Sequence, residues 1–137
     1  PGPLHSAPPG DSRLYLHREE KTTQLTTDHT RAWGQWNRGE ISEFAYRTHP
    51  RRSALYDALG AGHPGIRPQI ESHSLQGDDR LLLCTDGLID GIWERGLATE
   101  LADHGESTDL ASRILARARE NNRDDDATLI VAKIAQL

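Results

Sequence analysis

Several residue types are scarce in this chain of 137 residues. It contains no methionine, one cysteine, one phenylalanine and one valine, Val131. A single thiol cannot form a disulfide framework, and Cys84 stands within an apolar run, so we interpret it as a small buried residue in a reducing, cytoplasmic setting. The scarcity of valine is unusual for a core built from strands, and it indicates that part of a sheet is missing.

Long hydrophobic runs and an excess of positive charge are also lacking. No apolar stretch approaches the roughly 20 residues that a membrane-spanning helix needs, and no secretory signal opens the chain, which predicts a soluble protein. The formal net charge is -5 and the pI is about 5.8. We therefore expect no nucleic-acid or membrane partner, because both require a basic surface. The absence of methionine leaves two explanations, a removed initiator or a chain that begins downstream of its gene's start.

The length and the hydrophobic pattern predict one domain of the α+β class, with strands and helices around a single core. Strands are expected at residues 12–17, 21–25, 69–75, 80–85 and 128–134, and helices at residues 30–38, 42–46, 51–59, 97–104 and 109–118. The unbroken leucines of the strand at 80–85 predict burial on both faces and a central place in the sheet. Residues 1–9 contain four prolines, so we expect a disordered arm or a cloning remnant there and place the domain at 10–137.

Three aspartates stand where a predicted strand meets a turn: Asp11, Asp86 and Asp125. Asp86 comes just after the apolar run Leu81–Cys84 and just before Gly87, which predicts a fixed negative charge at the rim of the fold beside an accessible backbone. Oxygen ligands gathered from distant segments are typical of sites for hard cations such as Mg²⁺ or Mn²⁺. Each aspartate taken alone is more simply a turn residue, because turns favour aspartate.

The segments around these aspartates, in their order along the chain, resemble bacterial PPM (PP2C-like) serine/threonine protein phosphatases. The resemblance is carried by Gly10–Leu16, Gln24–His29, Leu55–Gly60, Gly77–Leu88 and Asp125–Thr128. It covers the C-terminal two thirds of the family's domain and leaves only residues 1–9 unmatched. It implies a partial PP2C-like β-sandwich, in which antiparallel sheets are flanked by helices and the family's N-terminal strands and helices are lacking.

The resemblance also implies roles for the three aspartates. In the family, the aspartates that match Asp86 and Asp125 bind the catalytic metal pair, and the one that matches Asp11 supports an additional ion. The implied cofactors are two or more Mn²⁺ or Mg²⁺ ions. The implied reaction is hydrolysis of phosphoserine or phosphothreonine in proteins by a metal-activated water, with a phosphoprotein as substrate.

Other positions in the matched segments are assigned supporting roles. Family members have asparagine after the last aspartate, where this chain has Asp126, and Asp125 is kept as the ligand because the following residues then stay in register. Gly87 and Asp126 are expected to support the ligands, through the backbone or from beside them. Trp33 and Trp36 are interpreted as packing anchors of a flap, with substrate contact as the minority alternative.

Arg13 and His29 are expected to be structural. Arg13 either neutralises Asp11 or is a solvated strand residue. An imidazole titrates near neutrality and can act as a general acid, but the resemblance places His29 in a structural loop next to the flap.

The resemblance further implies parts that these residues lack, including two long helices and an Asp-Gly motif whose aspartate bridges both metal ions. We therefore expect the parent protein to be the phosphatase, and this polypeptide alone to be weak or inactive and to self-associate through exposed sheet edges. The alternative is a degenerate PPM-like module that binds phosphoproteins without hydrolysing them. A haloacid-dehalogenase-type enzyme is disfavoured, because Cys84 stands where its nucleophilic aspartate belongs.

Overall fold

The computed structural model of the protein describes residues 2–6, 10–56, 70–103, 107–122 and 124–136. The strands are β1 Leu4–Ser6, β2 Arg13–Arg18, β3 Lys21–Gln24, β4 Glu71–His73, β5 Arg80–Cys84 and β6 Leu129–Lys133. The helices are α1 Arg31–Asn37, α2 Glu43–Arg47, α3 Asp86–Ala102 and α4 Ser107–Asn121. Among the described residues, no helix is long and apolar enough to cross a membrane.

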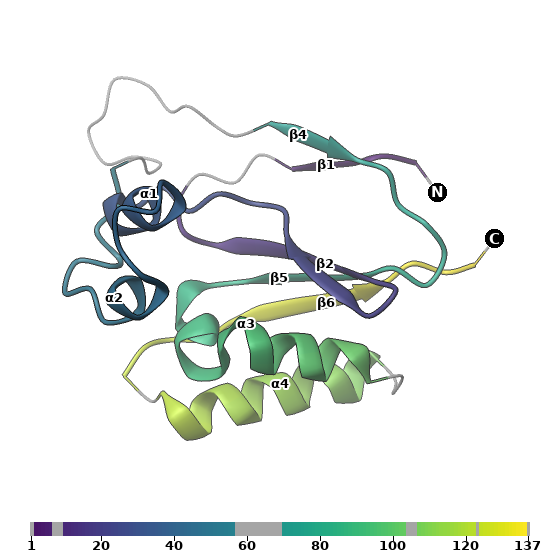
Figure 1. Ribbon diagram of the computed structural model, residues 1–137. Coiled ribbons are helices and arrows are strands. Elements are labelled where there is room, and N and C mark those ends of the chain that lie inside the picture. Colours follow the sequence, from purple (N-terminus) through teal and green to yellow (C-terminus); the bar gives the residue numbers. More distant parts are fainter. Residues whose placement is uncertain (1, 7–9, 57–69, 104–106, 123, 137) are drawn as a thin grey trace.

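The elements are arranged in layers (Figure 1). A four-stranded antiparallel sheet has the order β3-β2-β5-β6, and β1 and β4 form a separate antiparallel ribbon. Helices α3 and α4 pack together on one face of the four-stranded sheet, while α1 and α2 lie at one end of it. We call residues 30–56, which include α1 and α2, the flap segment. The predicted α+β class with antiparallel sheets flanked by helices is confirmed.

One face of the sheet forms the core together with α3 and α4. Tyr15, Leu82 and Cys84 point from the sheet into this core, which confirms the predicted burial of the thiol. The helical members of the core are Leu88, Ile89, Ile92, Leu97, Leu101, Leu110, Ile114 and Ala118. Removal of this apolar surface from water is the main term that holds the helix pair on the sheet.

The other face of the sheet carries apolar side chains that α3 and α4 do not cover. Leu14 pairs with Leu83, and Leu83 pairs with Ile130, so the three form one row across the sheet. Leu83 is 42% exposed and Ile130 is 61% exposed. The prediction of burial on both faces of β5 is therefore wrong at Leu83, although β5 is an inner strand. A run of leucines shows that both faces are apolar, but it does not show what covers them.

Two short regions differ from the expectations. Leu4–Ser6 pair with Glu71–His73 in a ribbon, where a loose arm was expected. No proline falls within Leu4–Ser6, so the backbone of these residues can pair. One or two helical turns were expected at 51–59, but 51–56 form no helix and the remainder lies outside the described residues.

The helix expected at 97–104 begins earlier, at Asp86, directly after β5. Its N-cap residue is Thr85, and the carboxylate of Asp86 in the first turn is favourable next to the helix N-terminus. The helix is kinked at Trp93, whose φ of 54° and ψ of 163° are not helical. The end of the expected helix, His104, lies outside the described residues.

Candidate metal-binding site

A pocket opens at the end of the sheet where β5 is followed by α3. Its walls come from the loop before β2, the flap segment and the first turns of α3. We call it the acid pocket; its lining includes Asp11, Arg13, Asp28, Tyr46, Arg52, Asp86 and Asp90. Asp11 and Asp86, two of the three predicted ligands, thus line the same pocket although they are far apart in the sequence.

The third predicted ligand, Asp125, is brought beside this pocket by the backbone. The N–H of Thr85 donates to the carbonyl of Thr128 at 3.1 Å, and the N–H of Thr128 donates to Oγ1 of Thr85 at 3.1 Å. A Cβ atom on Gly87 would lie 2.6 Å from the carbonyl oxygen of Asp126 and 3.2 Å from Cγ of Asp125. Only glycine allows the aspartate segment to approach the start of α3 so closely.

His29 holds the loop that carries Asp11. The N–H of His29 donates to the carbonyl of Gly10 at 2.9 Å, and the N–H of Gly10 donates to Nδ1 of His29 at 3.3 Å. Gly10 has a φ of 100°, which glycine adopts without strain. His29 is buried, and its ring lies against Tyr56 with centroids 5.7 Å apart. The predicted structural role of His29 is confirmed, and this role positions Asp11.

The carboxylates of the site repel one another. Burial raises the pKa of Asp11 to about 6, and the negative charge of Asp86 adds to the rise. The pKa of Asp86 is likewise raised, first by burial and then by the charge of Asp125. A divalent cation is the species that relieves such repulsion, because it favours the charged form of each carboxylate.

Two other carboxylates of the acid pocket are already neutralised. Nε of Arg13 donates to Asp28 at 2.9 Å, and a terminal nitrogen of Arg13 donates to the other oxygen at 2.6 Å. Asp90 forms a bidentate ion pair with Arg52. Arg13 therefore pairs with Asp28 and is buried. Both expected alternatives, that it neutralises Asp11 or is solvated, are wrong, and its structural role is to hold Asp28.

The candidate ligands are all carboxylate oxygens, which is the type of ligand that hard cations prefer. Within the described part of the chain, however, no three His, Cys, Asp or Glu side chains are close enough together to hold one ion. Asp11 and Asp86 share the pocket, and Asp125 adjoins it through its contact with Gly87. Asp126 has an exposed side chain, and its carbonyl accepts from Oγ1 of Thr85 at 3.3 Å.

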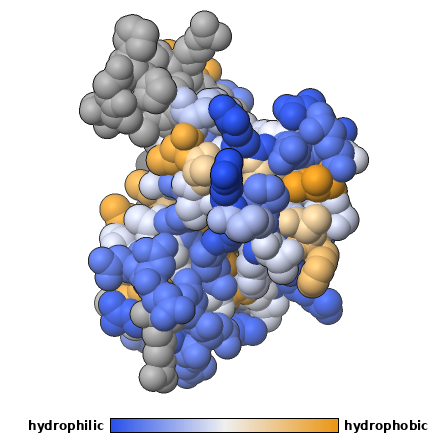
Figure 2. All heavy atoms as spheres, turned by 90° about the vertical axis from the view of Figure 1, so that its left-hand side faces the viewer, coloured by the Kyte–Doolittle hydropathy of each residue, from blue (hydrophilic) through white to orange (hydrophobic). Residues whose placement is uncertain are grey.

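The flap segment contributes residues that sequence reasoning missed. The hydroxyl of Tyr46 accepts from Arg13 at 2.7 Å and donates to Asp28 at 3.3 Å. The ring of Trp36 stacks on Tyr46 with centroids 5.0 Å apart, and neither Trp36 nor Trp33 lines the acid pocket. Stacking on Tyr46 gives Trp36 the expected packing role. Figure 2 shows this end of the molecule, where strongly hydrophilic side chains lie beside isolated hydrophobic ones.

No local pattern pairs Tyr46 with Arg13 or Arg52 with Asp90, since each pair joins segments that are distant in the sequence. The sequence offered one indication. Tyr46 is an aromatic residue on a short predicted helix, so its ring is expected to be buried and its hydroxyl to need a hydrogen-bond partner.

The chain is similar to known proteins over most of its length. Residues 35–135 match the family described as Stage II sporulation protein E (SpoIIE). The chain is 33% identical over 125 residues to the serine/threonine protein phosphatase PstP of Mycobacterium tuberculosis, an alignment that covers 91% of this chain and 24% of PstP. It is 30% identical over 128 residues to the serine/threonine phosphatase Stp of Listeria innocua, covering 90% of this chain and 49% of Stp.

Solved structures have the same fold. The crystal structure of the Mycobacterium tuberculosis serine/threonine phosphatase PstP/Ppp matches with a TM-score of 0.89 and 31% identity, covering 98% of this chain and 56% of that chain. A structure of the PstP catalytic domain in complex with two manganese ions matches with a TM-score of 0.82 and 28% identity, covering 99% and 55%. The chain thus spans between 24% and 56% of the lengths of these proteins. Together these similarities show that the chain belongs to the PPM (PP2C-like) family of bacterial serine/threonine protein phosphatases.

Proposed function

We propose that this chain supplies part of a metal-dependent site that hydrolyses phosphoserine or phosphothreonine in proteins. One observation carries the proposal: Asp11, Asp86 and Asp125, from the beginning, middle and end of the chain, adjoin at one end of the sheet. Carboxylates that lie close together, two of them half-buried, are unfavourable unless a cation compensates them. The similarity to a phosphatase domain that binds two manganese ions supports Mn²⁺ or Mg²⁺ as that cation.

Each residue has a separate task in this proposal. Asp11, Asp86 and Asp125 would hold the ions, and Gly87 lets the backbone of Asp126 keep Asp125 beside the start of α3. The bound ions supply positive charge for the phosphate oxygens and activate the attacking water. Phosphoproteins are the proposed substrates.

The number of ligands limits what these residues do by themselves. An Mg²⁺ ion takes about six oxygen ligands, so three carboxylates do not complete the coordination of two ions. We therefore propose that the 137-residue polypeptide has weak or no activity alone. Incubation with Mn²⁺ and a phosphothreonine peptide tests this, and turnover equal to that of PstP assayed in parallel would overturn it.

Metal binding is tested separately from turnover by isothermal titration with Mn²⁺. We expect Asp86→Asn to weaken Mn²⁺ binding by about 10-fold to 100-fold. The matched control is Asp109→Asn, an exposed acid in the first turn of α4 whose loss should leave Mn²⁺ binding unchanged. Equal binding by the wild type and Asp86→Asn would remove Asp86 from the metal site. Mn²⁺ binding without turnover, in a longer protein that contains this chain, would favour the alternative of a PPM-like binding module.

The composition and the partly exposed apolar row of the sheet support proposals about the location of the protein and its partners. The free buried thiol of Cys84 supports a reducing, cytoplasmic location, and the net charge of -5 argues against nucleic-acid partners. The apolar row of Leu14, Leu83 and Ile130 supports self-association of the 137-residue polypeptide.

A further inference from the structure

A second hollow lies between α2 and the kinked middle of α3, and we call it the arginine groove. Its lining includes Glu43, Arg47, Trp93, Glu94, Arg95 and Arg117. It has a volume of about 660 Å³. The groove is therefore large enough for several residues of a peptide.

The kink at Trp93 shapes the groove. A φ of 54° with a ψ of 163° is a conformation that residues other than glycine rarely adopt. Two cations hold the indole in place, because the guanidinium carbon of Arg47 lies 4.3 Å from the ring centroid and that of Arg52 lies 5.6 Å from it. Strain of this kind persists only where the surroundings impose it, and it is found most often at functional sites.

The groove and the acid pocket share a wall. Arg52 lines the acid pocket, and its guanidinium lies over Trp93, which lines the groove. Arg13 of the acid pocket lies 3.4 Å from Glu94 of the groove. A peptide whose phosphorylated residue lies at the mouth of the acid pocket would therefore place its neighbouring residues in the groove.

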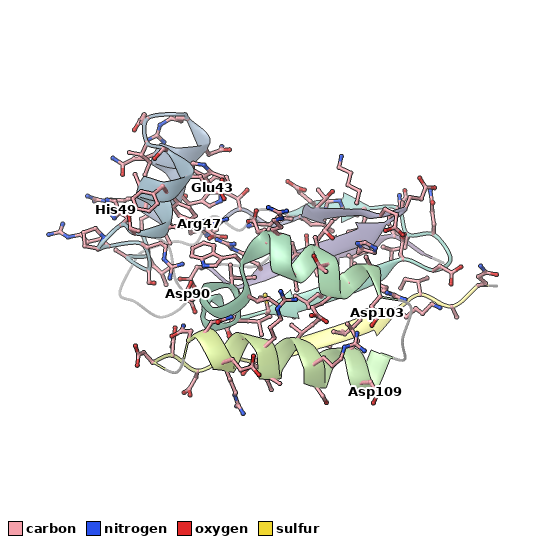
Figure 3. The ribbon with its side chains drawn as sticks, turned by 60° about the horizontal axis from the view of Figure 1, so that its bottom comes forward. Glu43, Arg47, His49, Asp90, Asp103 and Asp109 are labelled. Carbon is pink, nitrogen blue, oxygen red and sulfur yellow. The ribbon has the colours of Figure 1, made fainter. Side chains whose placement is uncertain are left out.

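The charge of the groove is opposite in sign to that of the whole chain. The three arginines and two glutamates of its lining give a net charge of +1, whereas the chain has a net charge of -5. Ion pairs already engage most of these charges: Glu43 pairs with Arg47, and Glu94 faces Arg13. Arg117 pairs with Glu100 at 2.7 Å, so among the described residues only Arg95 of the three arginines has no ion pair. Figure 3 shows Glu43 and Arg47 on the side of α2 that faces α3.

One guanidinium of the groove is available to a ligand. Arg95 is exposed and makes no ion pair with any residue that the structure describes. Arg47, in contrast, is already paired with Glu43, and its Nε atom is buried. Guanidinium groups bind carboxylates through paired hydrogen bonds, so an acidic peptide is the ligand that suits Arg95.

We infer that the arginine groove binds acidic residues that flank the phosphorylated residue of a protein substrate, an inference that rests on the proposed function. The groove thereby selects among phosphoproteins by the sequence around the phosphate. Trp93 of the groove lies under Arg52 of the acid pocket, and Arg95 places its positive charge farther along α3.

The test uses a fluorescein-labelled peptide with an unphosphorylated threonine between glutamates, and a second peptide with glutamines in their place. Binding to the 137-residue chain is followed by fluorescence anisotropy without metal. We expect the glutamate peptide to bind about tenfold more tightly than the glutamine peptide, and Arg95→Glu to weaken its binding by about fivefold. Arg95→Gln should cause a smaller loss. The charge-reversal control Lys21→Glu, at the start of β3, should leave binding unchanged.

Equal binding of the two peptides would overturn the inference. An equal loss of peptide affinity in Arg95→Glu and Lys21→Glu would also overturn it, because the effect would then come from the net charge of the chain alone. The assay contains neither metal nor phosphate, so its result does not depend on whether the acid pocket hydrolyses phosphoesters. A failed phosphatase assay with retained, Arg95-dependent peptide binding would reject the catalytic proposal and support the groove.

Discussion

The guanidinium of Arg13 and the carboxylate of Asp28 form a bidentate ion pair in which both side chains are only 4% exposed. This pair joins β2 to the loop that leads into α1, so it holds the flap segment against the sheet. The hydroxyls of Tyr15 and Tyr46 accept further hydrogen bonds from Arg13, at 3.0 and 2.7 Å. One wall of the acid pocket is therefore built from a buried, hydrogen-bonded charge network.

Removal of one partner of this pair should be strongly destabilising. Arg13→Met leaves the carboxylate of Asp28 buried and unpaired, and we expect the free energy of unfolding to fall by about 3–5 kcal/mol. The double variant Arg13→Met/Asp28→Leu should recover most of this loss, because no unpaired charge remains. Urea denaturation followed by circular dichroism measures both. A single variant as stable as the wild type would contradict the role given to the pair.

Stability should depend on pH through Asp79. Arg18 donates to both oxygens of the buried Asp79, at 2.7 and 2.6 Å, and these hydrogen bonds hold the pKa of Asp79 below its ordinary value of 3.8. The unfolded chain therefore binds this proton at a higher pH than the folded chain does. The stabilisation is complete above about pH 5 and is lost as the pH falls through 3.8 toward the lower folded pKa.

We expect Asp79→Asn to be less stable than the wild type near neutral pH and to lose less further stability on acidification. Urea midpoints measured between about pH 7 and about pH 3 report this difference. Asp109→Asn, which removes an exposed acid, should keep the pH dependence of the wild type. An unchanged pH dependence in Asp79→Asn would show that other carboxylates dominate.

Helix packing should be sensitive to Gly91. A Cβ atom there would lie 2.7 Å from the Cα of Ala118, which is too close for α3 and α4 to keep their present contact. We expect Gly91→Ala to lower the free energy of unfolding by about 1–3 kcal/mol. Gly34→Ala is the control, and it should raise the free energy of unfolding. The new Cβ would meet only the flexible end of Arg38, at 3.2 Å, and alanine should stabilise α1 by up to about 1 kcal/mol.

The metal site should be sensitive to Gly87. Gly87→Ala would force the backbone of Asp126 away and displace Asp125 from the start of α3. We expect Mn²⁺ affinity, measured by isothermal titration, to fall by about tenfold or more. Gly34→Ala serves again as the control and should bind Mn²⁺ as the wild type does. Unchanged Mn²⁺ binding by Gly87→Ala would argue against Asp125 as a ligand.

The open face of the sheet should drive association of the polypeptide. We expect light scattering to detect oligomers that become fewer in Ile130→Lys, because the lysine charge opposes burial of the row. Phe44→Lys replaces an exposed apolar residue on α2 and should leave the association state unchanged. A compact, stable monomer of the wild type at all concentrations would contradict the prediction.

Local sequence patterns were reliable where a single segment determines its own structure. The strand that ends before Asp86 and the neighbouring strands β2 and β3 were predicted from the hydrophobic pattern, and all three are present. The short helix that follows Ser42 was also predicted, and the Ser42 hydroxyl accepts from the N–H of Ala45 as an N-cap. These features depend on neighbours within a few residues, which the sequence displays directly.

Contacts between distant segments were less accessible. Arg13 was expected near Asp11, its neighbour in the sequence, but the flap segment brings Asp28 to it. The kink at Trp93 was not expected either, and the indole of Trp93 lies against arginines that come from the flap segment. In both cases the partner is selected by packing of segments that are far apart in the chain.

The sequence by itself determined five of the six strands that the structure describes, which aspartates adjoin them, and the family to which the chain belongs, because these depend on side-chain period and local motifs. Only the tertiary structure decided that Asp11 and Asp86 share one pocket, and that arginines neutralise its other acids. It also decided that Leu83 is 42% exposed on the sheet face opposite α3 and α4. Burial and charge pairing arise from surfaces that meet only when the whole chain has folded.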